Sequence, residues 1–375
     1  MRFKFFGWGG FSETATARSE STPYLTPHYS LLTIQAIRYI ARRVETITLK
    51  TDTDDCFAEA VAQAAAALRH GDLVALPTET VYGLAANALD ESCVAKIFEA
   101  KDRPAKNPII VHVVDESMAR DCVAEWPAAA AALAKAFWPG PLTLVLPKAE
   151  GIPGNVTAGG DTVGVRWPGH PLMQEVIRAC RFPLAAPSAN VSNQVSPTTA
   201  AHVSAQLDGR IPLIIDGGAA NVGIESTVVE VAGDAVRVLR PGMISAEAVT
   251  AVWSKGAGGS ETGILKSPGQ LPRHYAPNAR LLVLTWTDVE DLEKQIAYSR
   301  TPHDRVCVIA HTSIMSATRF GRVSVFPNDP ESYARALYAE LHQCDAEGAE
   351  LIVVEAVPEA TEWQGIADRL ARAGG

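Results

Sequence analysis

Short apolar runs alternate with helical patterns along most of this chain, and that alternation is the strongest constraint on its fold. The apolar runs are typical of buried strands and stand at 73–76, 109–114, 142–146, 163–166 and 184–186. Helical spacing of apolar residues lies between them, at 54–69, 92–100, 128–137 and 172–180. Gly71 follows the first of these stretches, as expected where a helix ends. The pattern predicts an α/β domain with a largely buried sheet.

A stretch rich in Gly, Ser and Lys interrupts the alternation at 254–271 and predicts a linker. Beyond it the pattern resumes, with apolar runs at 281–284, 306–310, 323–326 and 351–354 and a helical pattern at 332–345. A chain of 375 residues exceeds the usual size of one hydrophobic core. We therefore expect a larger domain at 46–253, a linker at 254–277 and a smaller α/β domain at 278–375.

The first 45 residues differ from the rest in composition. They carry six Lys and Arg against three Asp and Glu, and they are rich in Ser and Thr. This composition is typical of an organelle transit peptide, and equally of sequence upstream of a misassigned start codon. Both interpretations stay open, so residues 1–45 are set apart as an N-terminal extension.

Composition and charge exclude several classes of protein. A hydrophobic content of 47% with 20% charged residues is ordinary for a globular protein. The net charge of −9 argues against non-specific wrapping of nucleic acid. No apolar run approaches the ~20 residues that cross a bilayer, so we expect a cytoplasmic protein without membrane segments. The six cysteines form no C-x-x-C pair and predict reduced, buried thiols.

A cluster of basic residues stands out inside the acidic larger domain. Lys96, Lys101, Arg103 and Lys106 lie just before a predicted strand that carries His112. The cluster is consistent with a solvated helix end, where cations are favourable. Its acidic surroundings and its place between two sheet elements favour an anion-binding loop instead. A lone histidine on a strand is by itself more typical of the core.

Two polar loops follow predicted strands, at the ends where open α/β sheets bind ligands, and a third polar segment precedes a strand. Pro77–Leu84 combines two threonines and a glutamate with a glycine that permits close backbone approach. Ala186–Asn190 and Ser196–Thr198 offer small side chains and backbone amides that suit phosphate oxygens. Gly223–Thr227 leads into a Val-rich strand. Each loop alone is also typical of an ordinary turn.

Arg166 is a sharper signal, because Val163 and Val165 place it in a predicted buried strand. A buried guanidinium without a partner costs on the order of several kcal/mol. It must therefore pair with an internal carboxylate or with an anionic ligand, and the residues leave both open. A bidentate contact to a carboxylate or phosphate would contribute roughly 1.5–3 kcal/mol. A second arginine, Arg240, ends another predicted strand.

Several familiar signatures are missing from the sequence. It contains no G-x-x-x-x-G-K-[ST] loop, no G-x-S-x-G elbow and no H-E-x-x-H pair. A P-loop ATPase, an α/β-hydrolase and a zinc protease of that type are therefore disfavoured.

Taken in order, these segments resemble the YrdC family. The motifs P-T-E-T-x-Y-G-L, K-x-R-x-x-x-N-P, A-P-S-A-N, S-P-T, E-S-T and R-P-G stand at 77–84, 101–108, 186–190, 196–198, 225–227 and 240–242. S-P-G at 267–269 and R-H-Y-A-P at 273–277 resemble the linker of the longer, two-domain threonylcarbamoyl-AMP synthases. The resemblance implies a twisted open mixed sheet of the YrdC type, followed by a smaller Rossmann-like α/β domain. It covers residues 50–375 and leaves out the first 45.

The family resemblance also implies a reaction. L-threonine, bicarbonate and ATP would give threonylcarbamoyl-AMP and pyrophosphate, with Mg²⁺ on the phosphates and no metal site built by the protein. This activity would make the chain a nucleotidyltransferase. Its product would pass to a tRNA threonylcarbamoyltransferase for modification of the adenosine beside the anticodon, and the enzyme would at most bind tRNA weakly.

Site residues carry over from the family by position. Threonine or its carbamate would be held by Thr80, His112, Arg166, Ala186 and Ser226, with Arg166 on the carboxylate. ATP would be held by Lys101, Arg103, Asn107, Thr162, Ser188, Ser196 and Arg240. Tyr275, with Arg273 and His274 beside it, would close over the nucleotide as a gate. Lys101, Arg103 and Arg166 are the expected catalytic residues.

This sequence departs from the family pattern at two places. Its linker reads Gly269–Arg273 where a Met and an aromatic or basic pair are frequent, and Asn193 stands where Gly is usual. Two other functions share this domain. One is a non-catalytic module that binds double-stranded RNA. The other is a carbamoyltransferase of hydrogenase maturation, which resembles a much longer chain with zinc-finger cysteines.

Overall fold

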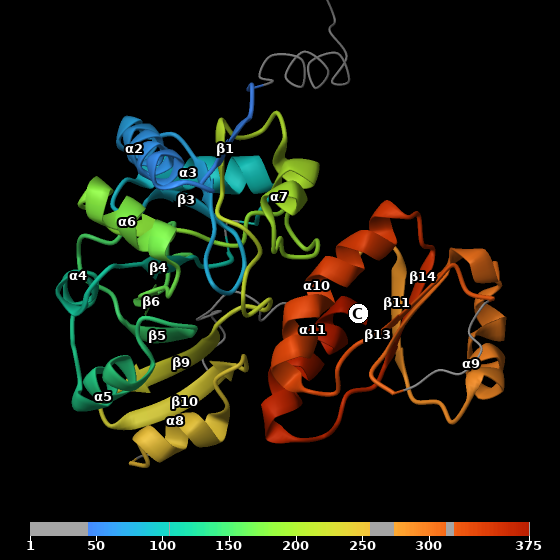
Figure 1. Ribbon diagram of the computed structural model, residues 1–375. Helices are drawn as coiled ribbons and strands as arrows, with labels where there is room; N and C mark the ends of the chain where they lie inside the picture. The colour runs from blue at the N-terminus through green and yellow to red at the C-terminus, as the bar shows by residue number, and fades with distance from the viewer. Residues whose placement is uncertain (1–43, 105, 256–273, 313–318, 375) are drawn as a thin grey trace, which may run out of the picture. The chain divides into compact units, whose positions relative to one another are not determined.

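The computed structural model describes residues 44–104, 106–255, 274–312 and 319–374 (Figure 1). Almost all of the expected N-terminal extension and most of the expected linker, including Arg273, lie outside the described residues. Within the described part of the chain, one mixed sheet and one smaller parallel sheet form, each with its own helices. The expected fold class is confirmed.

The larger sheet orders its ten strands β1-β8-β2-β3-β7-β4-β6-β5-β9-β10. Their bounds are β1 (Ile47–Lys50), β2 (Val74–Leu76), β3 (Gly83–Asn87), β4 (Ile110–His112), β5 (Leu142–Pro147), β6 (Thr162–Arg166), β7 (Leu184–Ala185), β8 (Leu213–Asp216), β9 (Thr227–Ala232) and β10 (Ala235–Arg240). Parallel pairs such as β4 with β6 alternate with antiparallel pairs such as β4 with β7. The sheet is therefore mixed, as the family resemblance implied.

Helices cover both faces of this sheet. One face packs against α2 (Asp54–His70) and α6 (Pro171–Cys180). The other packs against α3 (Glu91–Lys101), α5 (Ala128–Phe137) and α7 (Ala200–Leu207). Successive residues of β2 alternate between the two cores, with Val74 and Leu76 in one and Ala75 in the other. Burial on both faces explains why the strands read as continuous apolar runs.

The larger domain also contains the short helices α4 (Glu116–Asp121) and α8 (Ala246–Val252). Helix α2 illustrates how local sequence sets an element's ends. The Thr53 side chain accepts a hydrogen bond from the Cys56 amide at 3.2 Å and so caps the first turn. Gly71 ends the helix at φ 88°, a conformation that suits glycine, as predicted.

The structure differs from the sequence prediction at Pro77–Leu84. The segment is not a loop throughout, because β3 begins at Gly83 and pairs with β2. Its sequence, Gly-Leu-Ala-Ala-Asn, has no β-branched residue and gives little strand signal. A Cβ at Gly83 would lie 3.2 Å from the Ala186 Cβ, so glycine here permits the close approach of the Ala186–Asn190 loop.

The smaller sheet is parallel throughout its described strands, in the order β11-β14-β12-β13. These are β11 (Arg280–Leu284), β12 (Val306–Ala310), β13 (Arg322–Val325) and β14 (Leu351–Glu355). Its helices are α9 (Val289–Ile296), α10 (Pro330–Ala346) and α11 (Gln364–Gly374), with short 3₁₀ turns η1 (Ala297–Ser299), η2 (His303–Arg305) and η3 (Thr361–Trp363). A smaller α/β domain after the linker was expected from the sequence, and the structure shows that its sheet is parallel.

Two glycines let helices of the smaller domain pack backbone to backbone on loops of the larger one. A Cβ at Gly223 would overlap the carbonyl oxygen of Ala334 in α10. A Cβ at Gly365, at the start of α11, would come within 2.8 Å of the Gly242 carbonyl oxygen. Val81 and Ile224 share a buried cluster with α10 and α11. The two domains thus share a hydrophobic core beside the loops at Pro77–Leu84 and Gly223–Thr227.

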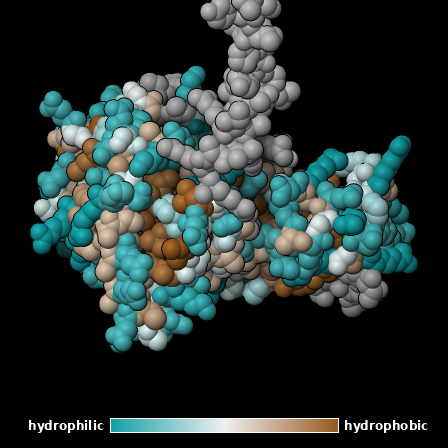
Figure 2. All heavy atoms as spheres, turned by 90° about the horizontal axis from the view of Figure 1, so that it is seen from above, coloured by the Kyte–Doolittle hydropathy of each residue, from teal (hydrophilic) through white to brown (hydrophobic). Residues whose placement is uncertain are grey.

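The surface of the described residues is mostly hydrophilic on the face that Figure 2 shows. Large hydrophobic side chains that stay exposed are scattered among separate elements, as with Leu89, Tyr298 and Val325. Within the described ranges, no helix has both the length and the apolar character needed to cross a bilayer.

Candidate functional site

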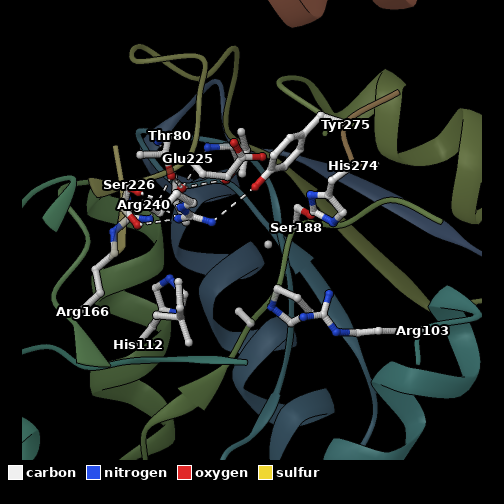
Figure 3. Close-up of a pocket in the computed structure, with 16 residues that line it drawn as sticks. Thr80, Arg103, His112, Arg166, Ser188, Glu225, Ser226, Arg240, His274 and Tyr275 are labelled. Atoms are coloured by element: carbon white, nitrogen blue, oxygen red, sulfur yellow. Dashed lines mark hydrogen bonds between the residues drawn. The ribbon is translucent and has the colours of Figure 1, made fainter. Parts of the chain in front are cut away.

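A pocket forms where the polar loops meet the carboxyl ends of β4 and β6. His112 ends β4 and Arg166 ends β6, and the two residues are register partners in adjacent parallel strands. The backbone ladder therefore fixes both side chains at one edge of the sheet. Figure 3 shows Thr80, Ser226, Arg240, Arg166 and His112 on one side of the pocket, with Ser188, His274, Tyr275 and Arg103 on the other.

Arg166 is buried and makes polar contacts on three sides. Its Nη1 donates to the Thr80 hydroxyl at 3.0 Å, and its Nε donates to the Gly140 carbonyl at 3.3 Å. Its Nη2 lies 2.7 Å from the Glu79 carboxylate. Of the two partners that the sequence left open, the structure shows the internal carboxylate. Glu79 is not part of the pocket lining, so it balances the Arg166 charge from outside the cavity.

His112 presents a neutral imidazole to the pocket. Burial and the nearby Arg166 charge lower its pKa to about 3. Its Nδ1 is buried and has no hydrogen-bond partner in the protein. A buried polar atom without a partner is unusual and is explained where a ligand supplies the missing group.

Ser226 and Arg240 form a second polar pair. The Ser226 hydroxyl lies 2.8 Å from the Thr143 hydroxyl, and Arg240 Nη2 donates to it at 3.1 Å. Arg240 also donates to the Ser226 carbonyl at 2.9 Å and to the Tyr275 hydroxyl at 3.4 Å. The register of β10 shifts between Val238 and Arg240, which turns the last residue toward the pocket.

Glu225 is a pocket residue that the sequence analysis quoted in a motif but did not assign. One carboxylate oxygen accepts from the Ser196 hydroxyl at 2.5 Å, and the other accepts from the Tyr338 hydroxyl at 3.0 Å. Arg369 Nε donates to the same oxygen as Tyr338, at 2.7 Å. Burial raises the pKa of Glu225, but the charges of Arg369 and Arg240 outweigh it and lower that pKa to about 2. Tyr338 and Arg369 belong to α10 and α11 of the smaller domain.

Arg103 lies on the opposite side of the pocket and is held by its own loop. Its Nη2 donates to the Pro108 carbonyl at 2.8 Å, and its Nε donates to the Asn107 carbonyl at 3.3 Å. Burial lowers its pKa to about 10, so the guanidinium stays charged at neutral pH. The side-chain amide of Asn107 is buried beside it, and neither its Nδ2 nor its Oδ1 has a hydrogen-bond partner in the protein. Both features leave capacity for an anionic or polar ligand.

Tyr275 closes this side from the chain that leads into the smaller domain. It is buried at 1% exposure and adopts φ 60°, in the left-handed region that an aromatic residue rarely occupies. Such a conformation costs on the order of 1–3 kcal/mol and persists only where surrounding contacts enforce it. The ring packs against His274 at 4.0 Å between centroids, and Arg369 lies over it at 5.2 Å.

Comparison with known proteins places this geometry in a family. The sequence model of the family described as "Telomere recombination" matches residues 66–242. The model of "Threonylcarbamoyl-AMP synthase, C-terminal domain" matches residues 244–375. The threonylcarbamoyl-AMP synthase of Pyrococcus abyssi is 41% identical over 320 residues, covering 83% of this chain and 93% of the relative. The chain belongs to the YrdC family, in its two-domain threonylcarbamoyl-AMP synthase branch.

Two further relatives extend this YrdC-family assignment. The threonylcarbamoyl-AMP synthase of Bacillus subtilis is 41% identical over 329 residues, which cover 84% of this chain and 93% of the relative. The structure of Pyrococcus abyssi Sua5 complexed with L-threonine superposes with a TM-score of 0.79 at 38% identity. That match covers 88% of this chain and 97% of the other. The resemblance inferred from the sequence is confirmed.

All five residues that the YrdC resemblance assigned to threonine line the pocket: Thr80, His112, Arg166, Ala186 and Ser226. Of those assigned to ATP, the lining includes Arg103, Ser188, Arg240 and Tyr275, with His274 beside them. The remaining four, Lys101, Asn107, Thr162 and Ser196, are outside it. The residues assigned to threonine thus all line the pocket. Those assigned to ATP are divided between the lining and the segments behind it.

Two of the four have a visible supporting contact. Lys101 is buried, and its ammonium donates to the carbonyls of Ser188 and Asn190, so it holds the Ala186–Asn190 loop. Ser196 is bound to Glu225. Thr162 begins β6 and shares a strand face with Arg166, ~13 Å further along. Only an extended ligand could reach from one to the other.

The described residues offer no protein ligand set for a divalent cation. Among them, no group of three His, Cys, Asp or Glu side chains comes together. The carboxylate in the described pocket lining, Glu225, is paired with Arg369. A cation that accompanies a nucleotide would therefore be held by phosphate oxygens and water, as Mg²⁺ commonly is.

Proposed function

We propose that this chain synthesises L-threonylcarbamoyl-AMP from L-threonine, bicarbonate and ATP, with release of pyrophosphate. This activity makes it a nucleotidyltransferase whose product serves threonylcarbamoyladenosine formation in tRNA, in the cytoplasm. Family membership supports the proposal, as does the threonine bound to a relative that aligns over almost its whole length. A tRNA threonylcarbamoyltransferase would consume the product.

The observation that carries the proposal is the joining of two chemically different walls in one pocket. One wall combines hydroxyls, a neutral histidine and an arginine, from Thr80, Ser226, His112 and Arg166. Arg240 lies on the same side and contacts both Ser226 and the Tyr275 hydroxyl opposite. The other is cationic and lined by small loop residues, with Arg103 and Ser188 facing Tyr275. The first suits a small zwitterion with a hydroxyl group. The second suits a polyphosphate with a planar base.

At the first wall, Arg166 would bind the substrate carboxylate. Its partner Glu79 lies outside the lining, so the pocket face of Arg166 does not have to lose that ion pair. Thr80 and Ser226 would bind the substrate's polar groups, and the unpartnered Nδ1 of His112 would gain a partner. Ala186 would bound the space beside them. These roles hold threonine in one orientation, with its amine toward the nucleotide wall.

At the second wall, Arg103 would bind phosphate oxygens and Ser188 would add a hydroxyl, while Arg240 would contribute its charge from the first wall. Lys101 and Ser196 would act from behind by holding the loops, and the free amide of Asn107 would complete the pocket floor. Thr162 would meet the far part of the nucleotide. Tyr275 would close over it.

The chemistry asks for positioning and charge stabilisation rather than covalent catalysis. Bicarbonate takes up a proton and loses water to give carbon dioxide, and the threonine amine adds to that carbon and loses a proton to give a carbamate. A carbamate oxygen then attacks the α-phosphorus, and the bond to the pyrophosphate oxygen breaks. Negative charge on the leaving group would grow next to Arg103 and Arg240. The rate would therefore depend on these two arginines, on Lys101 behind them and on Arg166, which holds threonine. Mg²⁺ bound to ATP would neutralise further phosphate charge.

Pyrophosphate release tests the proposal directly. Purified protein should release pyrophosphate from ATP only when threonine and bicarbonate are both present. Release that ignores threonine would contradict the proposal, as would no release at all. Tight binding of double-stranded RNA without pyrophosphate release would instead favour a non-catalytic module. Carbamoyl transfer from carbamoyl phosphate would favour the hydrogenase-maturation reaction.

A further inference from the structure

The ion pair of Glu225 is made with the smaller domain, while Arg240 of the larger domain adds a second positive charge nearby. Arg369 is fully buried, and its Nε lies 2.7 Å from the Glu225 carboxylate. Its Nη2 donates to the Glu225 backbone carbonyl at 3.3 Å, and its Nη1 donates to the Pro241 carbonyl at 3.1 Å. One side chain of α11 therefore binds both the E-S-T and the R-P-G segments of the pocket.

We propose that Arg369 is a positioning residue for the nucleotide: by cancelling the charge of Glu225, it keeps the pocket able to accept a polyphosphate. The inference rests on the proposed function and assigns the smaller domain a part in it. Arg369 does not line the pocket, so it acts through Glu225 and through the loops that Glu225 holds.

Charge in the pocket shows why this cancellation matters. Arg103, Arg166 and Arg240 supply positive charge to the described lining, and Glu225 supplies the carboxylate. The imidazoles of His112 and His274 are neutral, because burial lowers the pKa of each to about 3. An unbalanced carboxylate in this dry setting would repel phosphate far more strongly than it would in water.

Every element packed around Glu225 contributes a polar or charged group to it. The groups are Ser196 from its loop, Arg240 from β10, His274 and Tyr275 from the chain before β11, Tyr338 from α10, and Arg369 with its neighbour Asp368 from α11. Arg240 already binds Ser226 and Tyr275. Loss of Arg369 would therefore draw Arg240 toward Glu225 and away from phosphate.

A purely structural role for Arg369 makes different predictions. If Arg369 only held Glu225, Pro241 and the Tyr275 ring in place, its removal would displace these groups whether or not Glu225 were charged. Neutralising Glu225 would then not repair the damage. If charge balance is the cause, the defect falls on ATP, and a neutral Glu225 relieves it.

The test is direct ATP binding, measured by calorimetry without turnover. For Arg369→Met we expect ATP affinity to fall at least tenfold, while threonine affinity changes by less than about threefold. Adding Glu225→Gln in the same chain should restore ATP affinity to within about threefold of the starting protein. A double variant as weak as Arg369→Met would overturn the proposal, and so would equal losses for both ligands.

Two further measurements guard against a variant that fails to fold. Arg369→Lys keeps the charge in a smaller side chain, and we expect it to bind ATP within about fivefold of the starting protein. A Lys variant that folds yet binds ATP as poorly as a neutral one would contradict the proposal. ATP affinity of Arg369→Met should also improve as pH falls from 8 to 6, because loss of the Arg369 charge leaves burial opposed by Arg240 and Ser196 and so raises the pKa of Glu225 above its value in the unaltered protein.

Arg322→Met is the matched control. Arg322 is another arginine of the smaller domain paired with glutamates, Glu340 and Glu347, and it has no contact with the pocket. Its substitution should leave ATP affinity within twofold. Failure of the two proposals can be told apart. Absence of threonine-dependent pyrophosphate release in the unaltered protein would reject the proposed function, whereas normal ATP binding by Arg369→Met would reject only this inference.

Discussion

The two walls of the pocket are built in different ways. The threonine wall stands on neighbouring strands of one sheet, where backbone pairing aligns His112 with Arg166. The wall proposed for the nucleotide is assembled from a loop after α3, a loop after β7 and the chain before β11. Arg369 of α11 lies behind Glu225, between the two walls' supporting loops. The first wall is thus set by hydrogen-bond register within one domain. The second depends more on packing between the two domains, although the loops of Thr80 and Ser226 also pack on α10 and α11.

Charge balance follows the same division. The Arg166 charge meets Glu79, in the loop that also supplies Thr80. The Glu225 charge meets Arg369, at the far end of the chain. The Arg166 charge is thus balanced within the larger domain, whereas the Glu225 charge is balanced in part from the smaller one.

Arg166→Ala should give the largest effect, a loss of threonine-dependent activity with ATP binding retained. The substitution removes the expected carboxylate partner and leaves Glu79 without its cation, which by analogy with other buried pairs costs about 3–5 kcal/mol. We expect threonine-dependent pyrophosphate release to fall at least 100-fold, with ATP affinity within threefold. Steady-state kinetics and calorimetry measure the two effects. A near-normal apparent affinity for threonine would show that Arg166 does not bind the carboxylate.

Arg178→Ala serves as the control for this variant. Arg178 is a half-exposed arginine of α6 that pairs with Glu175 on the surface. Surface pairs of this kind contribute about 0–1 kcal/mol, so both rate and stability should stay close to those of the starting protein.

Gly365→Ala should have the opposite selectivity and raise the KM for ATP. The new Cβ would lie 2.8 Å from the Gly242 carbonyl oxygen, so α11 must shift away from the R-P-G segment. Overpacking of this kind costs roughly 1–3 kcal/mol, and we expect the KM for ATP to rise several-fold with little change for threonine. Gly374→Ala, in the same helix, meets Leu281 at an ordinary 3.5 Å and is the control. Equal changes in both KM values would contradict a wall-specific effect.

His112→Gln should weaken the pH dependence of the protein's stability. Burial lowers the pKa of His112 in the folded protein to about 3, below its value in the unfolded chain. The unfolded state therefore binds more protons, and stability present above pH ~6.5 is lost as pH falls toward 3. One such group adds a slope of up to about 1.4 kcal/mol per pH unit.

Thermal unfolding at pH 7, 6 and 5 checks this. The Tm of the unaltered protein should fall with decreasing pH, and the fall should be shallower for His112→Gln. His70→Gln removes an exposed imidazole outside the pocket and is the comparison. Identical slopes for the unaltered protein and His112→Gln would contradict a buried neutral imidazole.

Asn193→Gly should have the smallest effect. Asn193 adopts φ 69°, a conformation that Asn tolerates and Gly favours, which accounts for Asn where the family usually has Gly. Its carbonyl accepts from the Ala276 amide at 2.9 Å, and a glycine retains that bond. We expect stability within about 0.5 kcal/mol and unchanged KM values. A marked change in the KM for ATP would show that this loop needs the Asn side chain.

Much of the fold could be predicted because its strands are apolar runs separated by capped helices. The helix at 128–137 and the strand at 306–310 match the predicted bounds. Strand β3 could not be predicted in this way, since Gly-Leu-Ala-Ala-Asn has neither alternation nor β-branched residues. Its pairing with β2 and β7 comes from the tertiary structure.

The pocket shows a similar limit. Motif order led to the residues of the threonine wall, because each lies at the end of a recognisable strand or loop. It did not lead to Arg369, which reads as one more solvated cation on an amphipathic helix. Motif order also grouped Lys101 with Arg103 as residues that bind ATP. In the structure, the Lys101 side chain donates to the carbonyls of Ser188 and Asn190. Partnerships between residues far apart in the chain leave no local pattern in a single sequence.

Under the proposed function, the buried amine of Lys101 would link nucleotide binding to proton uptake. It contacts two carbonyls, and burial together with the Arg103 charge holds its pKa well below the usual range. A polyanion arriving beside it favours the charged form and raises that pKa again. Binding must then draw protons from the solvent to the extent that the free protein had lost them. Calorimetry in two buffers of different ionisation enthalpy would register this uptake as a difference in apparent binding heat.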